Sequence, residues 1–510
     1  MATTFNSVDP RTGETGPSYE EATTDDVRAA VAAAADAHRS GALADREKRT
    51  TLLRGAAARL RAAGDEIVAL AESETGLPEG RLRGELERTA GQLEAFAAVV
   101  DAGDYVEAII DTPDPDAKPI PRPDVRRMLV PIGPVAVFGA SNFPLAFSTA
   151  GGDTASALAA GVPVVVKGHP SHPGTSERVA RELSAAVADA GLPAGTFGHL
   201  PAASLEVANE LIDAPAIKAV GFTGSYAAGR AIADRAAARP EPIPVYAEMG
   251  SVNPIVVTEA ALGARADAIA EGLTASVANF GGQLCTKPGV VFVPAGETGD
   301  AFAADVAHRL EATEPTVLLN ERLRDALREA VGRLEPRVER LAGAREADGP
   351  GFRHAPSAYR ASASALAGSP ELLEEHFGPV VLFLTYASGD ELLAALERID
   401  GQLTGTLHAE GEEDVAGLVE LLAARAGRVI FDGFPTGVAV THGMHHGGPF
   451  PATTAPAHTS VGMTAITRWL RPVAFQDAPE AVLPPELRAD NPLGIWRRVD
   501  GELTREPLKT

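Results

Sequence analysis

The residue with the most conspicuous chemistry in this chain is its single cysteine, Cys285. It lies in the segment FGGQLCTKPG (280–289), after a predicted helix and a Gly pair. A lone cysteine is often only a small buried hydrophobic side chain. Glycines, however, let the backbone approach a bound ligand closely. A thiol at the mouth of a loop is accessible, so the segment indicates a nucleophilic role for Cys285.

A thiol that attacks an aldehyde needs donors for the oxyanion, a hydride acceptor, and a base that activates water to hydrolyse the thioester. Asn142, in SNFP (141–144), offers a neutral amide donor, although an Asn before Phe-Pro is also an ordinary turn residue. Glu248, in YAEMGSVNP (246–254), offers a carboxylate, although surface carboxylates are common. Both residues are therefore candidates for catalysis.

A phosphate site is indicated at the segment FTGSYAAG (222–229), which follows a predicted strand and opens a predicted helix. Backbone N–H groups at a helix N-terminus bind phosphate, which makes Gly224 and Ser225 candidates for a pyrophosphate site. The same segment is also compatible with an ordinary strand–helix turn. The usual GxGxxG dinucleotide fingerprint does not follow a predicted strand in this chain.

The elements that must position these residues alternate between strands and helices. Residues 24–106 are predicted to be helical, with Thr24 as the first N-cap, and the Pro- and Asp-rich stretch 112–124 is predicted to be a loop. The predicted helices are 25–41, 46–63, 81–101, 175–190, 226–238, 261–279, 300–312 and 320–341. The predicted strands are 126–130, 135–138, 162–167, 219–222, 254–257, 290–293, 380–385 and 428–432. This alternation predicts an α/β fold with parallel sheets and helical crossovers.

Composition excludes several classes of protein. A chain of 510 residues suggests two to four domains at roughly 100–200 residues each. The net charge of −24 disfavours nucleic acid and anionic membranes as partners. One cysteine permits neither an intramolecular disulfide nor a multi-thiolate zinc site. With no signal-peptide pattern and no apolar run long enough to span a bilayer, we expect a soluble cytoplasmic protein.

Five segments occur in an order that resembles the aldehyde dehydrogenase superfamily. They are FGASNFPLAFSTAGGDTASALAAGVPVVVKGHPSHPGTSE (138–177), VGFTGSYAAG (220–229), YAEMGSVNP (246–254), GGQLCTKPG (281–289) and EEHFGPV (374–380). The resemblance extends from about residue 8 to about residue 475. Within the superfamily the chain is similar to the α-ketoglutaric semialdehyde (2,5-dioxovalerate) dehydrogenase group.

The resemblance implies two Rossmann-type parallel-sheet domains and a small β element for oligomerisation. The dinucleotide-binding domain would comprise residues 1–110 and 135–250, and the catalytic domain residues 251–440. Strands in 111–134 and 465–485, around 122–131 and 469–476, would pair subunits into a homodimer or homotetramer. Residues 441–464, which include HGGPFPATT (446–454), would line the substrate tunnel.

The resemblance also implies roles for the candidate catalytic residues. Cys285 would attack the aldehyde to give a thiohemiacetal, whose oxyanion accepts hydrogen bonds from Asn142 and the Cys285 N–H. Hydride transfer to the nicotinamide would leave a thioester, which water activated by Glu248 would hydrolyse to the acid.

The same comparison implies a set of cofactor-binding residues. Lys167 would contact the adenosine ribose, Ser225 a phosphate beside Gly224, and Glu375 the nicotinamide ribose. His169 and Phe377 lie in segments that look cofactor-binding. For Lys167 and Glu375, the alternative interpretation is an ordinary solvated surface charge.

Departures from the family pattern bear on specificity. Pro170 stands where NAD-specific members usually have Glu, which removes repulsion against a 2′-phosphate and favours NADP, with NAD as the alternative. Ala457 stands where the semialdehyde group usually has Arg, and Leu284 and Lys287 replace an expected Phe and Asn. The substrate is therefore either α-ketoglutaric semialdehyde, oxidised to 2-oxoglutarate, or a different aliphatic or aromatic aldehyde.

Three other interpretations are less well supported. A cysteine acyltransferase or hydrolase would need a His paired with Cys285, and no His lies in the sequence segments around Cys285, Glu248 or Asn142. A non-catalytic binding or structural protein would be signalled by loss of these residues. A metal site at His442, His445 and His446 would lack nearby carboxylates in the sequence, so no metal is expected.

Overall fold

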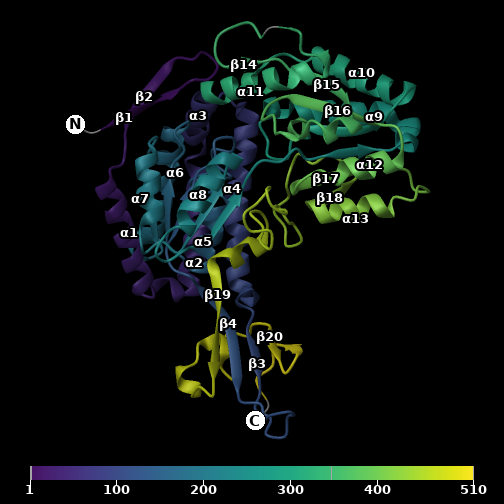
Figure 1. Ribbon diagram of the computed structural model, residues 1–510. Helices are drawn as coiled ribbons and strands as arrows, with labels where there is room; N and C mark the ends of the chain where they lie inside the picture. Colours follow the sequence, from purple (N-terminus) through teal and green to yellow (C-terminus); the bar gives the residue numbers. More distant parts are fainter. Residues whose placement is uncertain (1–2, 346, 509–510) are drawn as a thin grey trace.

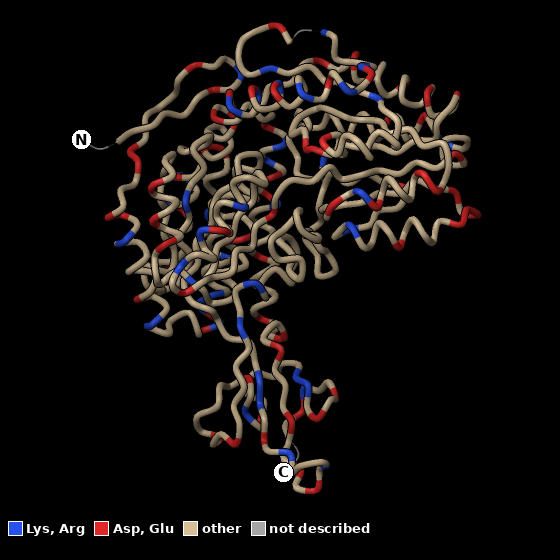
Figure 2. The backbone as a smooth tube through the Cα atoms, in the orientation of Figure 1, with Lys and Arg blue, Asp and Glu red and all other residues tan. Residues whose placement is uncertain are grey.

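The computed structural model describes residues 3–345 and 347–508. Figure 1 shows two α/β regions side by side and a narrow β extension that projects away from them. An N-terminal hairpin lies at the edge of the molecule, and consists of β1 (Thr4–Val8) and β2 (Thr15–Glu20). No helix in the described part of the chain is long and apolar enough to cross a membrane. Figure 2 shows that acidic and basic residues are interspersed over the outer elements.

Four helices precede the first parallel sheet. They are α1 (Thr24–Arg39), α2 (Arg46–Ala62), α3 (Gly64–Thr75) and α4 (Glu79–Ala102). The prediction of Thr24 as the N-cap is wrong by one residue. The hydroxyl of Thr23 accepts the N–H of Asp26, and the Asp26 carboxylate accepts the Thr23 N–H. This reciprocal capping box places the start of the helix at Thr24 itself.

The first parallel sheet has the strand order β7, β6, β5, β8, β9. Its strands are β5 (Val135–Phe138), β6 (Val164–Lys167), β7 (Phe197–Leu200), β8 (Ala219–Thr223) and β9 (Val245–Glu248). The helices between them are α5 (Gly152–Ala160), α6 (Pro173–Asp189), α7 (Leu205–Asp213) and α8 (Tyr226–Ala237). From β5 the chain adds β6 and β7 on one side, and it then returns to add β8 and β9 on the other side of β5. Such a switch in strand order opens a ligand crevice at the carboxyl ends of the strands.

The second sheet has seven strands in the order β13, β15, β16, β11, β10, β17, β18, parallel except for the edge strand β13. Its strands are β10 (Ile255–Val257), β11 (Val290–Pro294), β13 (Glu339–Ala342), β15 (Ser357–Ser362), β16 (Val380–Tyr386), β17 (Gln402–His408) and β18 (Ala426–Phe431). Its helices are α9 (Glu259–Ala278), α10 (Glu297–Glu311), α11 (Glu321–Leu334), α12 (Gly389–Leu396) and α13 (Ala416–Arg425). The two parallel sheets agree with the predicted α/β class.

The predicted helix 320–341 is wrong in its last turns. Helix α11 ends at Leu334, a short 3-10 turn follows, and the chain then forms β13. Pro336 has no N–H to donate and its ring clashes with the preceding turn, so the helix cannot continue through it.

The projecting extension is a five-stranded sheet in the order β19, β4, β3, β20, β21. Its strands are β3 (Ile109–Asp111), β4 (Val125–Pro131), β19 (Leu470–Gln476), β20 (Arg497–Val499) and β21 (Glu502–Thr504). β4 and β19 pair antiparallel, with Leu470 opposite Pro131. β20 and β21 lie beyond the expected range 465–485, so the extension uses more of the C-terminal segment than predicted.

Candidate active site

The candidate residues come from facing edges of the two parallel sheets. Asn142 follows β5, Ser225 follows β8 and Glu248 ends β9, all at the carboxyl edge of the first sheet. Cys285 precedes β11 and Glu375 precedes β16, both at the amino edge of the second sheet. These segments enclose one cavity of about 140 Å³. Its lining includes Asn142, Gly224, Ser225, Glu248, Cys285, Glu375 and Phe377.

The backbone before Cys285 follows a path that requires glycine. Phe280, Gly281 and Gly282 are consecutive residues with positive φ angles of 50°, 67° and 64°. A Cβ on Gly282 would lie 2.3 Å from the Gly378 carbonyl oxygen, so a larger residue cannot occupy this position without displacing the backbone. The structure thus gives the Gly pair a role in bringing the Cys285 loop against the segment that carries Glu375.

A buried amide holds the other side of the same loop. Asn253 Nδ2 donates to the Cys285 carbonyl at 2.8 Å and to the Lys287 carbonyl at 3.0 Å. Lys287 is itself buried, and its Nζ donates to the Val380 carbonyl at 2.8 Å. These bonds restrict the loop from both flanks of the thiol, which pre-organises the position of the sulfur.

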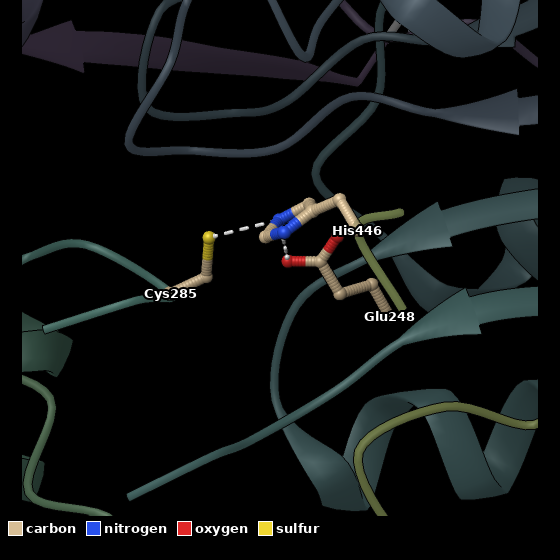
Figure 3. Close-up of side chains that lie close together, drawn as sticks. All are labelled: Glu248, Cys285 and His446. Carbon is tan, nitrogen blue, oxygen red and sulfur yellow. Dashed lines mark hydrogen bonds and ion pairs between the residues drawn. The ribbon is translucent and has the colours of Figure 1, made fainter. Parts of the chain in front are cut away.

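Three side chains meet at the thiol (Figure 3). His446 Nε2 lies 3.5 Å from Cys285 Sγ and 3.1 Å from Glu248 Oε1. Ser460 Oγ donates to the second Glu248 oxygen at 2.8 Å. His446 and Glu248 are both buried, whereas Cys285 is partly exposed. One carboxylate oxygen therefore accepts a hydrogen bond, the other lies at ion-pair distance from His446, and the group lies beside the thiol rather than in solvent.

The electrostatics of this group keep the carboxyl ionised and the thiol protonated. Burial raises the pKa of Cys285 well above its usual value, and the charge of Glu248 raises it further. Burial would also raise the pKa of Glu248, but the charge and hydrogen bond of His446, with the bond from Ser460, lower it below its usual value overall. A carboxylate next to a thiol in this state can accept a proton.

Asn142 is buried and oriented at the same cavity. Its Nδ2 donates to the Gln283 carbonyl at 3.0 Å, two residues before the cysteine. Arg81 donates to the Asn142 carbonyl, and its guanidinium lies 4.1 Å from the centre of the Phe280 ring. The Asn142 amide is thus held beside the Cys285 loop, where an oxyanion donor would be needed.

The residues expected to bind the cofactor fall into two groups. Gly224, Ser225, Glu375 and Phe377 share the cavity with Cys285. Lys167 and His169 lie outside its lining, at and just after the carboxyl end of β6. Burial lowers the pKa of Lys167 to about 8, and burial lowers the pKa of His169 well below its usual value.

The residues near the carboxyl ends of β5 and β8, where the strand order switches, fit a dinucleotide. The Ser225 hydroxyl caps α8, and Gly224 and Ser225 line the cavity at the start of that helix, where a pyrophosphate can bind. Glu375 is half-buried and lines the cavity, and desolvation raises its pKa to about 7 against the opposing charge of Lys287. Its carboxyl oxygens can accept hydrogen bonds from ribose hydroxyls.

The sequence profile of the Aldehyde dehydrogenase family matches residues 1–449. The chain belongs to the aldehyde dehydrogenase family. The activity of this family is the NAD(P)-dependent oxidation of an aldehyde to a carboxylic acid, so this chain is an oxidoreductase.

Curated relatives of this aldehyde dehydrogenase include two semialdehyde dehydrogenases. It is 45% identical to α-ketoglutaric semialdehyde dehydrogenase 2 of Azospirillum brasilense, over 98% of this chain and 96% of the relative. It is 41% identical to α-ketoglutaric semialdehyde dehydrogenase of Acinetobacter baylyi, over 96% of this chain and 94% of the relative. The predicted resemblance to this group is thereby confirmed.

Solved structures share the fold of this aldehyde dehydrogenase at low sequence identity. γ-Glutamyl-γ-aminobutyraldehyde dehydrogenase from Burkholderia cenocepacia has a TM-score of 0.80 and 23% identity, with 93% of both chains covered. 1-Pyrroline-5-carboxylate dehydrogenase from Thermus with bound NAD has a TM-score of 0.78 and 22% identity, covering 93% of this chain and 90% of the other. These likenesses confirm the aldehyde dehydrogenase fold.

The structure corrects one argument made from the sequence of this aldehyde dehydrogenase. The statement that no His is available to Cys285 is wrong, because His446 contacts it from 161 residues further along the chain. The statement that the histidines of 442–446 lack carboxylates is also wrong for His446, which pairs with Glu248. A weak signal was present: His446 directly precedes Gly447 and Gly448, a pair that permits close backbone packing.

Proposed function

We propose that this aldehyde dehydrogenase oxidises α-ketoglutaric semialdehyde to 2-oxoglutarate through a thioester on Cys285. The observation that carries the proposal is that Cys285, Glu248 and Asn142 line one cavity, while His446 contacts both Cys285 and Glu248. The substrate is supported by the full-length similarity to two enzymes of that name. Ala457, where the group usually has Arg, is exposed and does not line the cavity, so this departure does not argue strongly against that substrate.

The proposed steps follow from the positions of these side chains. The Cys285 proton passes toward His446 and Glu248, the groups beside the sulfur, and the thiolate attacks the aldehyde carbon. The oxyanion of the thiohemiacetal accepts hydrogen bonds from Asn142 Nδ2 and the Cys285 N–H. After oxidation, Glu248 removes a proton from the water that attacks the thioester, and the acid leaves with regeneration of the thiol.

The bound nicotinamide cofactor supplies the hydride acceptor for the oxidation step. In our proposal Ser225 and Gly224 hold the pyrophosphate, Lys167 the adenosine ribose, and Glu375 the nicotinamide ribose. His169 and Phe377 shape the same cofactor-binding surface.

NADP is the cofactor that we propose as preferred, because Pro170 leaves no carboxylate at its own position to repel a 2′-phosphate. The charge of Glu21 does act on Lys167, but Glu21 Oε1 also accepts the N–H groups of Ala203 and Ser204 at the start of α7. These bonds spread its negative charge. Removal of that charge in Glu21→Gln should raise the ratio of kcat/KM for NADP over NAD further.

An aldehyde panel tests the proposed function. Reduction of NADP and NAD would be followed by absorbance with α-ketoglutaric semialdehyde, succinic semialdehyde, pentanal and benzaldehyde, for wild type and Cys285→Ala. The expected result is the highest kcat/KM with α-ketoglutaric semialdehyde and NADP, and no activity in Cys285→Ala. A higher kcat/KM with pentanal or benzaldehyde would instead assign an aliphatic or aromatic aldehyde.

We also propose a homodimer or homotetramer that pairs through the β4–β19 extension. A cavity of about 650 Å³ lies at the base of that extension, and Cys285 is not among its lining residues. It is lined mainly by apolar atoms, among them Met128, Val130 and Leu470, as a subunit contact would be. Light scattering that gives a 52.7 kDa particle would contradict this assembly.

A reduced cysteine suits the reducing cytoplasm, which is the location we propose.

A further inference from the structure

Two half-buried arginines close to the active site have no acidic partner. Arg88 lies on α4 and Arg428 lies on β18. Within residues 3–345 and 347–508, no carboxylate oxygen lies within 4.0 Å of either guanidinium. Burial lowers the pKa of both groups, which reflects the cost of holding a cation away from water. The charges of Glu85 and Glu248 act on Arg88 only from beyond ion-pair distance, so an anion that binds beside either guanidinium would be stabilised.

The two guanidinium groups converge on one short backbone segment. Arg88 Nη2 donates to the Val438 carbonyl at 3.3 Å. Arg428 donates to the Pro435 carbonyl at 2.6 Å and to the Gly437 carbonyl at 3.1 Å. Since these three carbonyls belong to four consecutive residues, two cations from distant parts of the chain flank the same loop.

Both arginines lie near the segment that carries His446 and Gly447. The Arg88 guanidinium lies 5.1 Å from the centre of the Phe147 ring, and that ring lies 6.5 Å from the His446 ring. His446 in turn contacts Cys285. Next to Arg428, Gly427 packs so closely on the Gly447 carbonyl that a Cβ would lie 2.1 Å from its oxygen. A Cys285 thiolate, once formed, would interact favourably with both guanidinium groups.

We propose that Arg88 and Arg428 form an anion subsite that binds the carboxylate end of the substrate while its aldehyde carbon lies at Cys285. A guanidinium binds a carboxylate through paired N–H donors and keeps its charge at every physiological pH. The subsite selects aldehydes that carry a carboxylate at the opposite end of a short chain. This inference rests on the proposed function and names the residues that give it specificity.

A third arginine in this region has a different environment. Arg81 is paired with Glu85 at 3.8 Å, and its guanidinium lies between the Phe143 and Phe280 rings at 4.7 and 4.1 Å from their centres. The protein already provides its counter-charge and both aromatic faces, although Arg81 Nε and Nη1 have no hydrogen-bond partner. Arg81 therefore supports the Asn142 segment and is not assigned to the subsite.

Steady-state kinetics with matched aldehydes test the subsite. kcat/KM would be measured for wild type, Arg88→Gln, Arg428→Gln and their lysine variants, with α-ketoglutaric semialdehyde and with pentanal. Arg83→Gln is the matched control, because Arg83 lies on the exposed face of the same helix and pairs with Glu79 and Asp65. We expect kcat/KM of the Gln variants with the semialdehyde to fall roughly 10- to 100-fold, mainly through a higher KM, as for loss of a charge-assisted hydrogen bond. With pentanal the loss should be slight, and the lysine variants should be partly rescued.

A second measurement reports binding without turnover. Glutarate, a dicarboxylate that cannot be oxidised, should slow the alkylation of Cys285 by iodoacetamide in wild type and in Arg83→Gln. Protection should be lost in Arg88→Gln and Arg428→Gln. Unchanged protection, or an equal loss of kcat/KM with both aldehydes, would overturn the subsite. If one variant does not fold, as judged by circular dichroism, the other arginine and the lysine variants decide the result.

The two proposals can fail separately. If wild type prefers pentanal to the semialdehyde, the proposed function fails. If wild type prefers the semialdehyde but the arginine variants keep that preference, the function stands and the subsite fails.

Discussion

One imidazole contacts both the thiol and the carboxylate: His446 Nε2 lies 3.5 Å from Cys285 Sγ and 3.1 Å from Glu248 Oε1. The carboxylate is also held by Ser460, so its distance from the sulfur is set by two neighbours. This geometry couples the protonation of the nucleophile to the charge of the proposed base, which leads to the first two predictions.

Removal of the Glu248 charge should make the thiol more reactive while it stops turnover. Glu248 is a cause of the raised Cys285 pKa, and the thiolate is the form that alkylates, so Glu248→Gln should lower that pKa. We expect iodoacetamide to modify Cys285 several-fold faster at pH 7 in this variant than in wild type. In wild type the rate should rise with pH throughout the neutral and alkaline range. Slower alkylation of the variant at pH 7 would contradict the assigned interaction.

Zinc should inhibit the enzyme reversibly at this group. The ligand atoms of Glu248, Cys285 and His446 lie within 4.8 Å of one another, and a tetrahedral zinc site needs donor separations of about 3.3 to 3.8 Å. Micromolar Zn²⁺ should suppress activity, and EDTA should restore it. Mg²⁺, which prefers oxygen ligands, is the control and should not inhibit. His446→Asn should weaken zinc inhibition about tenfold or more. EDTA alone should leave wild-type activity unchanged, since no metal is assigned to catalysis.

Loss of the Asn142 amide should slow chemistry more than binding. Asn142→Ala removes one proposed oxyanion donor, so kcat should fall roughly 10²- to 10³-fold with little change in KM. Asn142→Asp provides a matched comparison, because it keeps the shape but replaces a donor with a negative charge, and it should be at least as inactive. An equally large rise in KM in Asn142→Ala would indicate a role in substrate binding instead.

Trp469 should be a large contributor to folding stability. Its side chain is fully buried, and its Nε1 donates to Ser156 Oγ at 2.8 Å, which joins the start of the β extension to α5. Trp469→Ala should reduce the free energy of unfolding by about 3–5 kcal/mol through lost burial and the cavity left behind. Thermal unfolding followed by circular dichroism measures the effect, with exposed Trp496→Ala as the control that should be nearly neutral.

Local sequence patterns predicted the elements with continuous apolar runs. The strands around 135–138, 219–222 and 290–293 are found where predicted, because short continuous apolar runs suit strands of a parallel sheet covered on both faces. Strand β17 was not predicted although all its residues are buried, since QLTGTLH mixes Thr, Gly and Gln with only two leucines. Two of its polar side chains have tertiary partners that sequence patterns do not reveal: Thr404 donates to Asn253, and Gln402 accepts from Ser251.

By itself, the sequence determined the α/β class, the aldehyde dehydrogenase resemblance and the single thiol available for covalent chemistry. These depend on short segments, in which spacing and residue type carry the information. Only the tertiary structure decided that His446 lies between Cys285 and Glu248, and that Arg88 and Arg428 converge on one loop. His446 meets Cys285 from 161 positions away, and Arg88 contacts Val438 from 350 positions away, because the long coil after β18 returns to the active site. No local pattern encodes either contact.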